Sequence, residues 1–324
     1  MGWRRREFLK IVPAAAAGLY LSGKSCWAGE GRAGGEKKCS DKFPNRILGK
    51  TGERVSMIAF GGIVVMNAEP EHAAKVVAEA VDAGINYFDV APSYGDAEVK
   101  LGPALKPFRD QVFLACKTGE RDRKGAEKEL KQSLKRLQTD HFDLYQLHAI
   151  TDVKEDVETA LGKGGAMEAI LEARRAGLIR YIGFSAHSAE AALAAMREFD
   201  FDTTMYPINF VCHYNSNFEP AVIAEAKKRE MGIIALKAMA KQRWQGPRRY
   251  KKTWYEPIDE RELAHKALSW TLSQGVTVAI PPGEEKLWRM AVELGPTCKA
   301  PNSNELSELE QVAKNCEAIF PEED

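Results

Sequence analysis

The order of apolar and amphipathic segments constrains this chain more than any other feature of its sequence. Eight short apolar stretches rich in β-branched residues recur along it, and a segment with helical spacing of apolar residues follows each one. Leu130, Leu134 and Leu137 show that spacing in one helical segment. Strands that are apolar throughout are typical of a parallel sheet buried on both faces. Eight such units predict a (β/α)8 TIM barrel rather than an open doubly wound sheet.

The segments can be placed along the chain. We expect barrel strands at residues 58–65, 85–89, 112–117, 142–148, 179–184, 203–208, 232–237 and 276–280. A β-hairpin at residues 46–57 precedes the barrel, and a C-terminal helix at residues 304–319 ends it. Left-handed helix caps are expected at Gly84, Gly177, Gly232 and Gly275. No G-x-G-x-x-G motif follows the first strand, which argues against a Rossmann fold.

The beginning of the chain resembles a twin-arginine export signal. The run R-R-E-F-L-K at residues 5–10 fits that pattern, and a weakly apolar segment at residues 11–21 follows it. The expected domains are a signal peptide at 1–28, a flexible linker at 29–44 and the barrel at 45–324. The export machinery is then a partner, and the protein is periplasmic or exported. If the leader is only a disordered basic segment, the protein is cytoplasmic.

Charge and cysteine content exclude several classes of protein. The chain has 46 basic and 46 acidic residues, whereas a nucleic-acid-binding protein usually carries a basic excess. No apolar run reaches the ~20 residues of a membrane-spanning helix. None of the six cysteines forms a C-x-x-C pair, so no zinc ribbon or redox dithiol is expected and no metal site is predicted. An oxidising compartment would allow a Cys298–Cys316 disulfide.

Reactive side chains stand at the ends of three consecutive expected strands. Asp89 ends the second strand, Lys117 the third and His148 the fourth, and Tyr94 lies in the loop after Asp89. In a TIM barrel the active site is built at these carboxyl ends. Each residue alone has a structural explanation, such as a turn cap or a solvated strand end, but their joint placement predicts a catalytic site. A buried Lys117 would need Asp89 nearby to remain charged.

These residues stand in motifs that resemble those of the aldo-keto reductases over about residues 45–300. The motifs are Arg46-x-Leu48-Gly49-x-Thr51-Gly52, G-I-N-Y-F-D-V-A-P-S-Y-G at 84–95, Lys117-Thr118, D-L-Y-Q-L-H at 143–148 and G-L-I-R-Y-I-G-F-S at 177–185. The resemblance implies an NAD(P)-dependent enzyme that reduces an aldehyde or ketone to an alcohol, or the reverse. Its catalytic tetrad would be Asp89, Tyr94, Lys117 and His148. Tyr94 would give the proton, because Lys117 lowers its pKa, and His148 would orient the carbonyl.

The resemblance also implies a nicotinamide dinucleotide across the barrel mouth. Its contacts would come from Gly62, Ser185, Met205, Lys237, Gly283 and Arg289. Ala186 and Met205 stand where relatives carry the Asn and Gln that hold the carboxamide. Glu284 and Glu285 lie where NADPH-preferring relatives carry basic and hydroxyl groups. NADP(H) is favoured as the cofactor, and NAD(H) stays open.

The loop after the seventh strand, residues 241–255, is rich in charge and aromatic rings. It holds six basic residues and four aromatic residues. Barrel topology places it over the mouth, where we expect it either to bind an anion or to be a solvated loop. The anion would be the cofactor pyrophosphate or an acidic substrate.

Two other functions compete with the reductase. One is a catalytically slow barrel that senses nicotinamide redox state or serves as an accessory subunit. The other is a glycoside hydrolase, which needs two carboxylates ~5 to 9.5 Å apart at the strand ends. His148 and Lys237 end the fourth and seventh strands, so the hydrolase is disfavoured. The expected partner is a small carbonyl or alcohol substrate.

Overall fold

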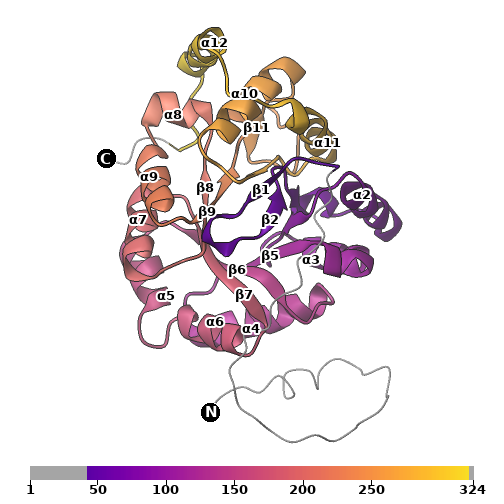
Figure 1. The fold of residues 1–324 in the computed structure, drawn as a ribbon, viewed down its shortest axis with the longest axis vertical. Coiled ribbons are helices and arrows are strands. Elements are labelled where there is room, and N and C mark those ends of the chain that lie inside the picture. Colours follow the sequence, from indigo (N-terminus) through magenta and orange to yellow (C-terminus); the bar gives the residue numbers. More distant parts are fainter. Residues whose placement is uncertain (1–41, 321–324) are drawn as a thin grey trace, which may run out of the picture.

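A computed structural model describes residues 42–320 of the chain; the predicted signal peptide and most of the predicted linker lie outside the described residues. Eight parallel strands form one sheet: β3 (Phe60–Gly61), β4 (Tyr87–Asp89), β5 (Phe113–Thr118), β6 (Phe142–Ile150), β7 (Ile179–Ala186), β8 (Thr203–Pro207), β9 (Gly232–Leu236) and β12 (Val278–Ile280). An isolated parallel bridge between Ile58, just before β3, and Ala279 in β12 brings the two ends of the sheet together. The predicted (β/α)8 TIM barrel is confirmed (Figure 1).

Helices follow the strands and surround the sheet (Figure 1). They are α2 (Pro70–Asp82), α3 (Ala97–Leu105), α4 (Arg123–Arg136), α6 (Ala166–Arg175), α7 (Ala189–Glu198), α9 (Pro220–Lys228), α10 (Arg261–Ser273) and α11 (Glu285–Leu294). Each buries one apolar stripe; in α2 the stripe is Ala73, Val76, Val77 and Ala80. The predicted C-terminal helix is α12 (Ser303–Lys314), which begins at an Asn302 capping box.

The predicted N-terminal hairpin closes the end of the barrel opposite the carboxyl ends of the strands. β1 (Asn45–Ile47) pairs antiparallel with β2 (Arg54–Ser56), and the hairpin lies across the centre of the ring in Figure 1. Leu48 between the strands is fully buried. It belongs to the inner core, which we define as Leu48, Val55, Ala59, Tyr87, Phe113, Ala115, Leu144, Met205, Ile234, Val278 and Ile280. The barrel interior is therefore filled with side chains.

The structure differs from the sequence expectation at two turns. The first strand is shorter than expected, because residues Gly62–Val65 form a 3-10 turn, η3. A Cβ on Gly62 would lie 2.8 Å from Val90 Cγ2, so glycine is needed where this turn packs on the loop after β4. Three of the four expected glycine caps are left-handed, but Gly232 is not. Glu230 takes the left-handed conformation instead, and Gly232 makes room for Leu48.

Several short elements were not predicted. They are a π-helix η5 (Val153–Glu158), α5 (Thr159–Leu161), α8 (Phe210–Ser216), and a hairpin of β10 (Ala240–Arg243) and β11 (Tyr255–Pro257). The disulfide between Cys298 and Cys316 does not form; both are free thiols. Among residues 42–320, no helix is both long and apolar enough to cross a membrane.

Candidate active site

The structure brings together all four residues of the predicted tetrad. Strands β4, β5 and β6 are neighbours in the sheet and deliver Asp89, Lys117 and His148 to one rim. Lys117 Nζ donates hydrogen bonds to Asp89 Oδ2 at 2.5 Å and to the Val90 carbonyl at 3.2 Å. The same ammonium lies 5.1 Å from the centre of the Tyr94 ring. The Tyr94 and His148 rings meet edge to face, 5.7 Å between centroids.

Burial and ion pairing together set the charge of Lys117. Lys117 is 0 % exposed and Asp89 is 2 % exposed. Burial by itself lowers the pKa of Lys117, but the Asp89 carboxylate and Tyr94 outweigh it, so its pKa is raised overall. Lys117 is therefore a permanent ammonium beside the Tyr94 phenol.

Tyr94 and His148 are both uncharged at neutral pH. Burial raises the pKa of Tyr94, and the opposing effect of Lys117 is smaller. Lys117 acts on the pKa of Tyr94 in the expected downward direction, but burial raises that pKa by more, so the phenol keeps its proton at neutral pH. Burial, together with the positive charge of Lys117, lowers the pKa of His148 to about 3. The site thus offers a phenol proton and a neutral imidazole near one permanent cation.

A network missed at the sequence level fixes the backbone around His148. Arg121 donates from Nη2 to the His148 carbonyl at 2.7 Å, and its Nε pairs with Asp156 at 2.8 Å. Ser185 Oγ accepts the N–H of Ala149 at 2.7 Å. Ala149 has a φ of 53°, a strained conformation for alanine that is typical of functional sites. Asp156 lies in the π-helix η5, an element also frequent at functional sites.

Four of the six residues predicted to contact a cofactor are two glycines, a serine and a methionine. Gly62 and Gly283 both serve close packing at the barrel rim; a Cβ on Gly283 would lie 2.3 Å from Ile63 Cγ2. Ser185 lies at the end of β7, and its hydroxyl proton is not used in its bond to Ala149. Met205 differs from Ser185 in its chemistry. It is fully buried in the inner core, in register with Ser185, and offers no polar group.

Arg289 is already neutralised by carboxylates. Its guanidinium pairs with Glu79 at 2.6 Å and with Glu285 at 2.9 Å. Glu285 also bonds to His72 at 2.6 Å. These contacts join α11 to α2. Because the guanidinium N–H groups of Arg289 already face carboxylates, the structure does not support the predicted contact between Arg289 and a cofactor phosphate.

Lys237 follows β9 and stands against two aromatic rings. Its Nζ is 5.5 Å from the centre of the Trp254 ring and 5.1 Å from that of Tyr255. Burial, reinforced by the positive charge of Lys117, lowers the pKa of Lys237 to about 8. Its backbone φ of 66° is left-handed. His187, directly after β7, was not predicted from the sequence as a site residue. Burial, and to a smaller extent the positive charge of Lys237, lowers the pKa of His187 to about 4.

The loop at residues 241–255 is folded rather than freely solvated. It joins strand β10 to strand β11. Lys252 Nζ in this loop donates a hydrogen bond to the Val64 carbonyl at 2.8 Å. The Lys252 N–H donates to Glu284 at 2.8 Å. The loop thus reaches from β9 to the segments that follow β3 and β12 along the mouth. Arg249 forms an ion pair with Asp259 at 3.0 Å, so one of the basic groups of the loop that were predicted to bind an anion is already paired.

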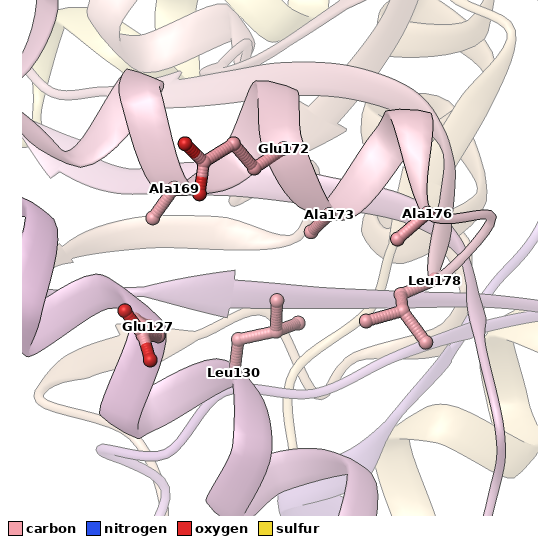
Figure 2. A pocket seen from close by; sticks show the side chains of 7 residues that line it. All are labelled: Glu127, Leu130, Ala169, Glu172, Ala173, Ala176 and Leu178. Atoms are coloured by element: carbon pink, nitrogen blue, oxygen red, sulfur yellow. The ribbon is translucent and has the colours of Figure 1, made fainter. Parts of the chain in front are cut away.

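A groove on the outside of the barrel is unrelated to the tetrad. Figure 2 shows it between α4 and α6. It is lined by Glu127, Leu130, Ala169, Glu172, Ala173, Ala176 and Leu178. Lys131 pairs with Glu127 and Arg123 pairs with Glu172, so both carboxylates are satisfied. The groove offers no unpaired polar chemistry.

Comparison with known proteins agrees with the fold. The profile of the Aldo/keto reductase family matches residues 57–323. The chain therefore belongs to the aldo-keto reductase family of oxidoreductases. Aldo-keto reductase YhdN of Bacillus subtilis (strain 168) is 32% identical over 190 residues, covering 54% of this chain and 54% of that protein. L-galactose dehydrogenase of Arabidopsis thaliana is 28% identical over 246 residues, covering 70% of this chain and 74% of that protein.

Solved structures share the barrel. Aldo-keto reductase AKR11C1 from Bacillus halodurans, in its holo form, matches with a TM-score of 0.68 and 21% identity over 87% of this chain and 100% of that one. An aldo-keto reductase from Klebsiella pneumoniae in complex with NADPH matches with a TM-score of 0.64 and 20% identity, over 86% of this chain and 95% of that one. In sequence, the chain spans about half the length of the curated Bacillus subtilis relatives YqkF and YhdN, 48% and 54%.

Proposed function

We propose that this protein is an NAD(P)-dependent oxidoreductase that converts an aldehyde or ketone to an alcohol, or the reverse, with Tyr94 as general acid and base. The observation that carries the proposal is the buried Lys117–Asp89 ion pair placed beside the phenol. A buried charge pair costs free energy to desolvate, and perturbed charged groups of this kind cluster at catalytic sites. A redox sensor or accessory subunit would not need a proton donor held this way.

Each tetrad residue has one task in the reaction. Tyr94 donates its proton to the oxygen of the carbonyl as negative charge develops there. Lys117 stabilises the resulting phenolate, because its ammonium remains charged and close to the ring. Asp89 holds that ammonium in place. His148 is neutral, so it can donate a hydrogen bond that orients the carbonyl without repelling a cationic neighbour.

We propose that the nicotinamide cofactor, which supplies the hydride when bound, lies against the rim at Ser185, Gly62 and Gly283. The Ser185 hydroxyl proton is a suitable donor to a carboxamide, because the oxygen already accepts from Ala149. The two glycines let the rim segments pack closely against Val90 and Ile63, which keeps the backbone beside the proposed cofactor position compact. NADP(H) is the proposed form, supported by the Klebsiella pneumoniae relative in complex with NADPH. Glu284 and Glu285 leave NAD(H) as the other outcome of a binding titration.

The replacement Tyr94→Phe tests the proposed reaction. The ring remains and only the proton donor is lost, so NADPH binding should stay within about twofold while kcat falls by ~10² to 10⁴. Reduction of 4-nitrobenzaldehyde, followed by NADPH absorbance, measures kcat, and NADPH fluorescence measures cofactor binding. Unchanged turnover in the variant would contradict the role of Tyr94.

We further propose export of the protein through the twin-arginine pathway, supported by the R-R-E-F-L-K run at residues 5–10. That pathway transports folded proteins, so the cofactor would travel with the barrel. The periplasm is the proposed destination. Such a location requires a cofactor that is held tightly or re-reduced by a second substrate.

A further inference from the structure

Lys237 carries a charge at the barrel mouth that its surroundings do not neutralise. Its ammonium makes no ion pair or hydrogen bond with any of residues 42–320, and its neighbours are the faces of Trp254 and Tyr255. Lys117, by contrast, is paired with Asp89. Withdrawing an ammonium from water without a partner costs free energy. Such a cation is expected where a ligand supplies the missing negative charge.

The backbone conformation at Lys237 sets the direction of its side chain. Its φ of 66° lies in the left-handed region, which a lysine rarely adopts. The Lys237 carbonyl accepts the N–H of Ala240 at 2.8 Å, closing the tight turn between β9 and β10. Strain of this kind persists where function requires it. The turn therefore holds the ammonium between the two aromatic faces, which attract it as cation–π partners.

The electrostatic surroundings of Lys237 favour an anion. Lys117 is near enough for its charge to lower the pKa of Lys237, and Lys237 in turn lowers the pKa of His148 and of His187. Both imidazoles are neutral at pH 7 as a result of burial and these charges. Asp89 already cancels Lys117. One positive charge is thus left over in the part of the mouth next to His148.

We propose that Lys237 binds a carboxylate of the carbonyl substrate, so that the enzyme acts on keto acids or aldehyde acids; this inference rests on the proposed function. Trp254 separates Lys237 from Phe320, whose ring lies 5.9 Å from that of Trp254 and 5.2 Å from that of His187. The predicted phosphate-binding positions lie at the start of α11.

Matched substrates separate recognition of the carboxylate from the chemistry. Succinic semialdehyde and its methyl ester have the same aldehyde, and 4-carboxybenzaldehyde and methyl 4-formylbenzoate form a second pair. Lys237→Met keeps the length of the side chain but removes the charge. The ratio of kcat/KM for acid over ester should fall about 10- to 100-fold, as expected for loss of a charged hydrogen bond. Lys237→Arg should retain a preference for the acid.

Lys251→Met is the matched control, because it removes one charge from an exposed position on the same loop. The acid-to-ester ratio should then change less than about threefold. If Lys237→Met leaves the ratio unchanged, the proposal is overturned. If it instead weakens NADPH binding at an unchanged ratio, the ammonium serves the cofactor phosphates, and the proposal is equally overturned.

A binding readout keeps this inference distinct from the proposed reaction. Calorimetric titration with 4-carboxybenzyl alcohol, the product-like acid, needs no turnover. Binding to wild type that is lost in Lys237→Met supports the anion site even if neither aldehyde is reduced, in which case only the proposed function fails. Equal binding to both proteins overturns the anion site, whatever the turnover.

Discussion

The replacement Asp89→Asn leaves the buried ammonium of Lys117 without its carboxylate. Lys117 is 0 % exposed, and its remaining bond would be to the Val90 carbonyl at 3.2 Å. Breaking a buried pair from one side costs about 3–5 kcal/mol of the free energy of unfolding. In a domain of this size each kcal/mol shifts Tm by about 2–4 °C, so Tm should fall by about 6–20 °C. Thermal unfolding followed by circular dichroism measures the loss.

The double variant Asp89→Asn, Lys117→Met supplies the control for stability. This double variant removes both charges. Replacing a buried ion pair by uncharged groups often leaves the free energy of unfolding unchanged. We expect it to regain most of the Tm lost in Asp89→Asn while remaining inactive, because Tyr94 has lost its cation. A double variant no more stable than Asp89→Asn, or an Asp89→Asn protein that unfolds at the wild-type temperature, would refute the role assigned to the pair.

Two further predictions concern acid stability and export. Burial lowers the pKa of His148 to about 3 and of His187 to about 4, below the value of ~6.5 in an unfolded chain. As pH falls from ~6.5 toward 4 the unfolded chain takes up these protons first, so the free energy of unfolding falls, by up to about 1.4 kcal/mol per pH unit for each imidazole. His187→Gln should flatten the dependence of Tm on pH in that range; an identical slope in both proteins would count against the buried neutral imidazole. Replacing Arg5 and Arg6 by Lys should retain the protein in the cytoplasm on cell fractionation, and a wild-type protein already found there would disprove the export signal.

The sequence by itself determined the barrel and the grouping of the four predicted tetrad residues at one rim. Strand and helix periodicities are local properties, so eight repeats of one unit were visible without any tertiary information. Asp89, Lys117 and His148 end consecutive parallel strands, and such strands bring their carboxyl ends to one rim. The loop of Tyr94 is short, so its place followed from that of Asp89. Local order along the chain was sufficient for these residues.

Only the tertiary structure decided which polar groups are available to a ligand. Arg289 is neutralised by Glu79, 210 residues away in sequence, and no local pattern reveals that pair. Lys237 stands between two aromatic rings and has no ion-pair partner among residues 42–320. The side chain of Met205 packs in the inner core, because the register of its strand places it inside the barrel. Burial and ion pairing depend on distant segments meeting in space, and these contacts decide the charge and accessibility of each side chain.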